Sequence, residues 1–325
     1  MRTSDAGTGA DTDPGTAADA VADAEWIDRS RRAALASHRL VGWIFWDPVG
    51  VANYAALGVP EGLGYYIATR GAPLAGAGNQ AVTAAFGSIH PDFVAVALDH
   101  CRAHTTFAEA AGARDRAVVE GLHEYVPEIV EGLAALADPM WAAVDALSPA
   151  GRPLFAAHRE WPRHADDPLL SAWLAVNCIR EWRGDTHWAI QITEGLSTDA
   201  AGVLDGAWRN YDDHWVARSR GADDTAVAAA LTELEALGLA NDGRVSLAGI
   251  EYRQYLEDRL DRLTVVPWQH LGAELTDRFI ELVEPVGMRL MARVDATAGP
   301  NWMPAGRDRV APTSTRVTTA ETAHT

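Results

Sequence analysis

The sequence predicts a mainly α-helical protein, in which an N-terminal helical domain is followed by a winged helix-turn-helix domain with a small two-stranded wing. Apolar residues recur at helical spacing along most of the chain, and glycine or proline interrupts them at short intervals. Between residues 197 and 265, two helical segments are followed by a hairpin signal and a long third helix, which is the winged plan. With 325 residues and 48% hydrophobic content, the chain can bury one large core or two ordinary ones.

The composition of both terminal segments predicts disordered tails. Residues 1–24 consist mainly of Asp, Ala, Gly and Thr, and residues 296–325 are rich in Pro, Thr and Ala. Such segments bury too little apolar surface to fold. We therefore expect a helical domain with a ligand pocket over residues 25–195, and a winged-helix domain with a C-terminal helix over residues 196–295.

The helical domain should open with a helix from Trp26 to Leu57 that Pro48 bends or breaks. Residues 56–76 hold several glycines and prolines and predict short helices and turns. Residues 80–104 predict two helices separated near Gly87 to Pro91, because a proline followed by an acidic residue is typical of a helix start.

The second half of this domain leads to its central helix. Residues 114–147 predict one or two helices with breaks at Pro127 and Pro139, and residues 151–168 predict a loop-rich connector. The helix from Leu169 to Thr193 is apolar on two sides, as expected of a helix packed at the centre of a domain.

This central helix also carries a dense charged cluster in IREWRGDTHWAI, residues 179–190. Charges on a buried helix must be paired, and paired groups in apolar surroundings often have shifted pKa values. Two interpretations stay open: a structural ion-pair network that fixes packing, or a ligand-binding or catalytic site.

The functional interpretation assigns a role to each candidate side chain. Arg70 and Arg183 would hold an anionic group such as a carboxylate. Asp185 and His187 would form an acid-base dyad, although residues two apart on a helix meet only through a ligand, water or a neighbouring helix. Tyr65 would donate to a developing oxyanion. The remaining predicted ligand-binding residues are Tyr66, Glu181 and Trp188.

The C-terminal half changes pattern after residue 197. One helix is expected from Thr198 to Val216, and a second follows residues 222–225 and ends at Gly238. An Asn-Asp-Gly turn between two short extended segments, the second at 244–247, then predicts a hairpin. A long helix ending at Pro267 and an amphipathic helix at about 271–294 complete the chain.

The charge of the chain argues against a nucleic-acid partner. The net charge is −18, and all 27 basic residues are arginine. Nucleic-acid affinity comes largely from basic side chains placed on phosphates. The expected recognition helix, residues 223–238, contains four carboxylates and no basic residue, so DNA binding is disfavoured.

The sequence lacks the motifs of several other functional classes. The chain has no dinucleotide or P-loop glycine pattern and no GxSxG elbow, so no cofactor is implied. Cys101 and Cys178 lie in apolar helical context, and His100 and His104 lack a third ligand, so no metal site is predicted. No apolar run is long enough for a membrane span and no signal pattern precedes the fold, so we expect a cytoplasmic protein.

Two blocks of sequence resemble a known bacterial family. They are GLGYYIATRGAPLAGAGNQAVTAAFGSIHPDFVAVAL at 62–98 and LLSAWLAVNCIREWRGDTHWAI at 169–190. Both are similar to the SalK-like winged helix-turn-helix proteins of actinobacteria, and the resemblance spans roughly residues 33–285. Trp182 and Thr186 stand where that family usually has His and Gly. The resemblance implies the winged scaffold more than any one activity.

These observations leave three hypotheses for function. The first is a small-molecule-binding protein, and more specifically an enzyme of bacterial natural-product metabolism whose reaction class the sequence does not reveal. The second is a ligand-responsive transcriptional regulator that binds DNA through the winged helix. The third is a non-catalytic protein-interaction module. A homodimer is compatible with each of them.

Overall fold

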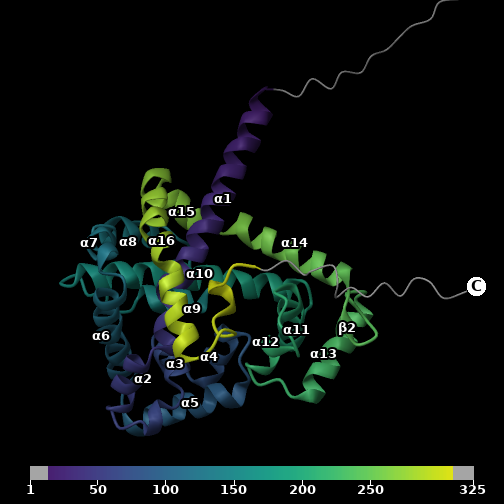
Figure 1. Ribbon diagram of the computed structural model, residues 1–325, viewed down its shortest axis with the longest axis horizontal. Coiled ribbons are helices and arrows are strands. Elements are labelled where there is room, and N and C mark those ends of the chain that lie inside the picture. The colour runs from purple at the N-terminus through teal and green to yellow at the C-terminus, as the bar shows by residue number, and fades with distance from the viewer. Residues whose placement is uncertain (1–13, 310–325) are drawn as a thin grey trace, which may run out of the picture.

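Figure 1 shows the computed structural model, which describes residues 14–309 and is built mainly from helices, as the sequence predicts. A framework of long helices spans it, and shorter helices fill the spaces between them. The long helices are α1 (Pro14–Gly42), α6 (Phe107–Tyr125), α10 (Pro168–Thr193), α14 (Leu247–Leu263) and α16 (Ala273–Thr297). The shorter ones are α2 (Pro48–Ala55), α3 (Tyr65–Gly71), α4 (Asn79–Phe86), α5 (Pro91–His104), α7 (Val130–Ala134), α8 (Ala137–Asp145), α9 (Pro153–Arg159), α11 (Thr198–Trp208), α12 (Trp215–Arg218), α13 (Asp224–Ala236) and α15 (Val266–Leu271).

Most helices begin where local sequence signals place them. Asp47 caps α2, accepting a hydrogen bond from the Val49 N–H at 2.9 Å, so Pro48 does start a new helix. Asp167 caps α10 in the same way, with 3.1 Å to the Leu170 nitrogen. Pro139 does not break its segment. It lies in the first turn of α8, where a missing N–H costs no intrahelical hydrogen bond.

The central position predicted for α10 is confirmed. It runs across the middle of the molecule in Figure 1, in contact with α1, α7, α8, α9 and α14. Trp173 is fully buried, and its indole N–H donates to the Leu40 carbonyl at 3.0 Å. The Trp141 indole N–H donates to the Ser171 hydroxyl at 3.0 Å. These contacts make α10 the axis of the large core, around which the N-terminal helices pack.

A second, smaller core lies in the segment 196–263, which we call the small unit. It comprises α11 to α14 and the hairpin β1 (Ala240–Asn241) and β2 (Arg244–Val245), paired antiparallel. The hairpin was predicted, and its turn places Asp242 and Gly243 at φ of 50° and 70°. Gly249 of α14 packs directly on this hairpin: a Cβ there would lie 2.2 Å from the Leu239 carbonyl oxygen.

Two boundaries in the C-terminal half differ from expectation. The helix expected from Thr198 to Val216 ends at Trp208, because Asn210, Asp213 and His214 take positive φ angles that a helix excludes. The expected division at residue 196 also groups α16 with the small unit. Its buried face instead packs on α1 and belongs to the large core.

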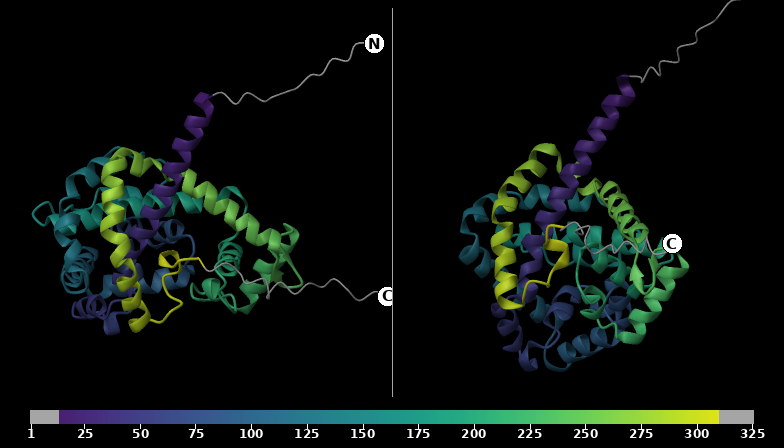
Figure 2. Two further views of the ribbon diagram at one scale, coloured as in Figure 1. Left: turned by 45° about the horizontal axis from the view of Figure 1, so that its top comes forward. Right: turned by 45° about the vertical axis from the view of Figure 1, so that its right-hand side comes forward.

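Both predicted tails extend too far into the chain. Helix α1 begins at Pro14, inside the segment 1–24, while residues 1–13 and 310–325 lie outside the described residues. Residues 298–309, which we call the C-terminal strap, fold back from α16 towards the small unit (Figure 2). Met303 is buried against Gly42, and Arg39 donates to the Gly306 carbonyl at 2.8 Å. Within the part of the chain that the structure describes, no helix has the length and apolarity needed to cross a bilayer.

Candidate functional site: an arginine-lined cavity

A cavity of about 200 Å³ lies where the large core meets the small unit. We call it the central cavity. Helices α1, α3, α4 and α10 line one side, α11, α12 and α14 line the other, and the C-terminal strap completes the wall. Five arginines reach it from different elements, which are Arg70, Arg183, Arg209, Arg220 and Arg253. A small cavity with this many guanidinium groups is unusual in a chain of net charge −18.

The cavity face that belongs to α10 and α3 is held by a buried ion-pair network. Arg70 makes a two-pronged contact with Glu181, at 2.9 Å from Nε and 2.6 Å from Nη2. Arg180 shares this carboxylate at 2.6 Å. Burial alone would raise the pKa of Glu181, but the two guanidinium groups outweigh it and hold the pKa well below its usual range. Glu181 is therefore a permanent anion beneath the cavity wall.

The opposite face, on α11 and α14, is joined to α10 by a second set of ion pairs. Arg183 contacts Glu257 at 2.8 Å and Asp261 at 2.7 Å. Arg253 contacts Glu257 and Asp205, each at 2.8 Å. Burial raises the pKa of Asp205, but the neighbouring arginines dominate and lower it to about 2.

Several polar groups on the cavity wall have no partner within the described residues. Arg220 forms no ion pair there, and its side chain donates only to the Val216 carbonyl, at 2.7 Å. Arg253 is 2% exposed, yet its Nη1 atom is buried without a hydrogen bond. Buried donors are nearly always satisfied in folded proteins, so this wall has spare capacity to bind an acceptor.

Two imidazole rings also line the cavity, those of His38 and His187, and neither ring has a hydrogen bond to another of the described residues. Burial and the adjacent arginines lower the pKa of His187 to about 4 and the pKa of His38 well below its ordinary value. Both rings are therefore neutral near pH 7, and each has one donor and one acceptor nitrogen.

The structure brings five of the eight predicted site residues into this cavity: Tyr66, Arg70, Arg183, His187 and Trp188. Tyr66 accepts a hydrogen bond from Arg70 at 2.8 Å, which holds its hydroxyl towards the guanidinium groups. Trp188 packs against the backbone at Gly87, where a Cβ would lie 2.3 Å from the indole ring. The first of the two motif blocks therefore contacts the second through specific side chains.

The other three predicted residues do not line the central cavity. Glu181 is used in the ion pairs beneath the wall. Asp185 faces α9, where its carboxylate accepts a hydrogen bond from the Phe155 N–H at 2.9 Å, so it does not form a dyad with His187. The physical reason is that residues two apart project from opposite sides of a helix. The Tyr65 hydroxyl lies against Gly50 and does not line the central cavity.

The placement of Asp185 predicts a pH-dependent stability. Burial raises the pKa of this carboxyl to about 7, despite the hydrogen bond from Phe155. Between about pH 4 and pH 7 the native state thus holds a proton that the unfolded chain has released, so stability falls as pH rises. Urea denaturation should show the wild type losing about 2–4 kcal/mol relative to Asp185→Asn between pH 4 and pH 8. Parallel pH profiles for the two proteins would contradict the assignment.

The wall residues that the sequence does not predict include His38 on α1 and those that the small unit and the C-terminal strap supply. The missed residues include His38, Asp205, Arg209, Arg220, Arg253, Glu257, Pro304 and Ala305. Four of them form two pairs with a recognisable sequence spacing, because Asp205–Arg209 and Arg253–Glu257 have the i, i+4 spacing of helical ion pairs. Nothing in the composition of residues 296–325 marks Pro304 as part of a wall.

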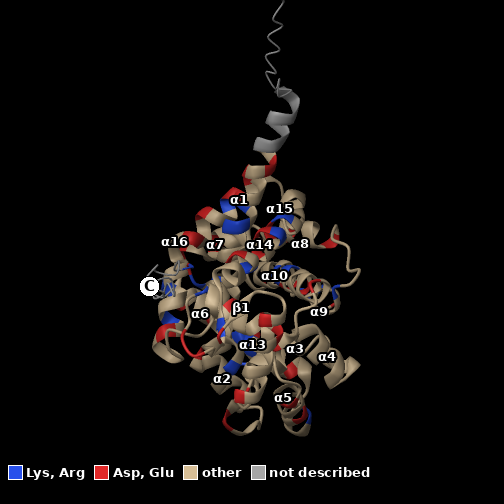
Figure 3. Ribbon diagram, turned by 90° about the vertical axis from the view of Figure 1, so that its right-hand side faces the viewer, with Lys and Arg blue, Asp and Glu red and all other residues tan. Residues whose placement is uncertain are grey.

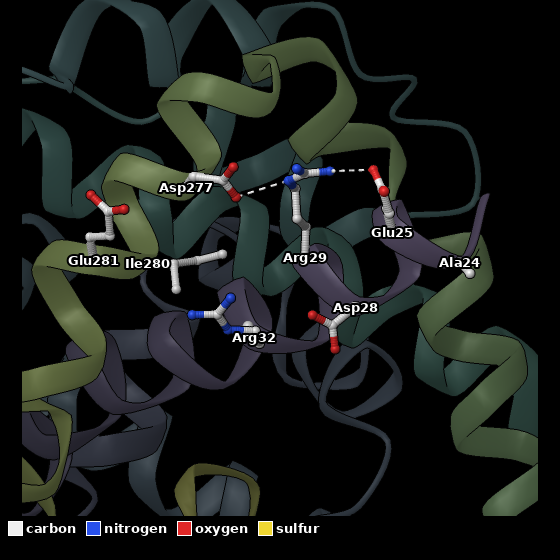
Figure 4. Close-up of a pocket in the computed structure, with 8 residues that line it drawn as sticks. All are labelled: Ala24, Glu25, Asp28, Arg29, Arg32, Asp277, Ile280 and Glu281. Carbon is white, nitrogen blue, oxygen red and sulfur yellow. Dashed lines mark hydrogen bonds and ion pairs between the residues drawn. The ribbon is translucent and has the colours of Figure 1, made fainter. Parts of the chain in front are cut away.

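A wider hollow of about 580 Å³ lies between α1 and α16 (Figure 4). Both arginines that line it are already paired: Arg29 at 3.7 Å with Glu25 and at 2.9 Å with Asp277, and Arg32 at 2.8 Å with Glu284. These side chains are open to solvent, where ion pairs are weak and water competes for them. The hollow therefore offers no desolvated polar group to a ligand, and the central cavity is the stronger candidate.

Comparison of the chain with known proteins identifies its family. No curated protein and no solved structure matches the chain. A family profile described as a helix-turn-helix family matches residues 30–298. That stretch includes both cores and all but the strap side of the cavity wall. Because the match covers well over half of the chain, this protein belongs to a helix-turn-helix family.

Proposed function

We propose that this protein binds an anionic small molecule in the central cavity. The observation that supports the proposal is the excess of positive charge there. Six arginines in and behind the cavity wall share five carboxylates, and four of these carboxylates already contact two guanidinium groups each. Arg220 is a seventh guanidinium and has no carboxylate of its own among the described residues. An anion would neutralise this excess.

The cavity wall also suits an anion at the level of single hydrogen bonds. Arg253, whose Nη1 has no hydrogen-bond partner, and Arg220, whose side chain donates only to the Val216 carbonyl among the described residues, line the same wall. Guanidinium groups bind carboxylates and phosphates through charge-assisted hydrogen bonds, and these strengthen where water is excluded. His38 and His187 add neutral donors from two other helices.

The experiment compares anions with their neutral amides. Thermal unfolding would be followed with acetate against acetamide and with benzoate against benzamide, in a phosphate-free buffer low in chloride. Binding to the native state should raise the melting temperature with the carboxylates and leave it unchanged with the amides; at a ligand concentration of 100 times Kd the stabilisation is about 2.7 kcal/mol. Equal effects of acid and amide, or no effect of either, would refute anion recognition.

Membership of the helix-turn-helix family favours a regulator over an enzyme as the setting for this binding site. In this second candidate function, α12 and α13 would be the two helices of a winged helix-turn-helix that contacts DNA. Figure 3 faces this side of the molecule; α13 carries no basic residue, and Arg218 beside it is paired with Asp224 at 2.8 Å. The resemblance to SalK-like proteins supports a ligand from bacterial natural-product metabolism.

The regulator hypothesis has its own test. Fluorescence anisotropy with labelled duplexes, selected from a pool of genomic fragments, would be measured with and without the anion that stabilises the protein. A regulator requires binding that changes with the anion, because the ligand must favour one of two states. Binding that is absent, or that is lost equally for all sequences as salt rises, would leave small-molecule binding without DNA recognition.

A further inference from the structure

A second cavity, of about 330 Å³, adjoins the central cavity. We call it the aromatic cavity. The two share Tyr66, Ser88, Arg220 and Pro304 as common wall residues. The rest of its wall is mostly apolar: Trp46, Tyr65, Ile67, Ile89, Phe93, Trp215, Trp302 and Met303. Together the two spaces lie within the range of ligand pockets, about 300–1,000 Å³.

The aromatic side chains of this wall support one another. Tyr66 stacks on Trp46 with ring centroids 5.7 Å apart, and Trp46 contacts Trp302 at 5.8 Å. Trp302 in turn meets Trp215 edge-on at 5.2 Å. These rings come from η1 (Trp43–Trp46), α3, α12 and the C-terminal strap, so the strap joins the two units through them. Ring faces held in this way form a preorganised site for a planar apolar group.

Arg220 and Tyr66 lie where the two cavities meet and connect the aromatic wall to the arginine-lined wall of the central cavity. Arg220 lines both cavities and makes no ion pair to any described residue. Tyr66 also lines both, and its hydroxyl is held by Arg70 while its ring stacks on Trp46. A ligand with its charge at Arg220 therefore has its body beside the stacked rings.

We infer that the ligand is an aromatic carboxylate, with its carboxylate at Arg220 in the central cavity and its ring in the aromatic cavity. This inference rests on the proposed anion-binding function and specifies the class of ligand. A single negative charge is assigned because Arg220 is the one cavity guanidinium that lacks a carboxylate among the described residues. A ring is assigned because the space next to that charge is walled by aromatic side chains.

Isothermal titration calorimetry with a ligand series tests the inference. The series is acetate, benzoate, 2-naphthoate, phenyl phosphate and 2-naphthamide. We expect 2-naphthoate to bind at least about tenfold more tightly than acetate, because only its ring occupies the aromatic cavity. We expect 2-naphthamide to bind more weakly than 2-naphthoate, because it lacks the charge.

Variants of the aromatic wall then test whether this wall causes the tighter binding of 2-naphthoate relative to acetate. Trp302→Ala and Trp215→Leu should each remove most of the difference between 2-naphthoate and acetate while leaving acetate affinity unchanged. Two variants are used because Trp302 belongs to the strap, whose packing depends on it. Trp161→Ala is the matched control, since Trp161 lies in the connector before α10 and lines neither cavity.

The outcomes separate this inference from the proposed function. Acetate and 2-naphthoate binding with equal affinity would overturn the aromatic assignment and leave anion binding in place. Phenyl phosphate binding more tightly than both aromatic carboxylates would overturn the assignment of a singly charged head group. If none of the anions bound, the proposed function itself would fail.

Discussion

Replacing Glu181 with glutamine is expected to lower the free energy of unfolding by about 3–5 kcal/mol, because it removes one partner from a buried ion-pair network. The Glu181 side chain is 1% exposed and is contacted by both Arg70 and Arg180. Glutamine keeps the shape but leaves two guanidinium groups close together without a counter-charge. Urea denaturation at pH 7 measures the loss.

The chain offers a matched control for this change. Arg32 and Glu284 form an ion pair with the same two-pronged geometry, at 2.9 and 2.8 Å, but both side chains are exposed. Water screens such a pair, so Glu284→Gln should change the unfolding free energy far less. If Glu181→Gln and Glu284→Gln lowered the free energy of unfolding equally, the buried network beneath the cavity would contribute no more to stability than an exposed ion pair.

Replacing Arg220 with glutamine is expected to weaken carboxylate binding by about 10- to 100-fold, the equivalent of one charge-assisted hydrogen-bonded contact. The melting temperature should stay within a few degrees of the wild type. Arg220 makes no ion pair with a described residue, so the change leaves no buried carboxylate unpaired. Calorimetry with benzoate, alongside a thermal melt without ligand, measures both quantities.

Arg218→Gln is the control for that experiment. It removes the same charge two residues earlier, from an arginine that is paired with Asp224 and lines neither cavity. Long-range electrostatics would weaken binding similarly in both variants, whereas direct contact affects only Arg220→Gln. Benzoate affinity that is unchanged in Arg220→Gln would place the anion elsewhere.

The parts of the fold that follow from nearby residues could be predicted from the sequence. The break at Pro48, the break at Gly87 and the central helix α10 all depend on signals within a few positions. The docking of α16 on α1 and of the C-terminal strap on Gly42 depends on partners more than 200 residues away. Sequence periodicity shows that a helix has an apolar face, but not which core that face contacts.

The residues of the central cavity likewise fall into two groups: those that helical spacing could place and those that only tertiary packing brings together. Arg183 and His187 fall on one side of α10 because they are four residues apart, and that helical period brought them into one cavity. Asp185 was placed with them through proximity in sequence, although its position on the helix directs it to α9. Arg220 and Arg253 were missed because only the packing of the small unit against α10 brings them to the cavity.

A crystal structure of the protein grown with 4-bromobenzoate would locate both ends of the bound ligand, since anomalous scattering from bromine locates the ring independently of the carboxylate density. We expect the carboxylate within hydrogen-bonding distance of Arg220 and the free Nη1 of Arg253, with bromine in the aromatic cavity. Bromine found only on the outer surface, with no ligand beside Arg220, would contradict it.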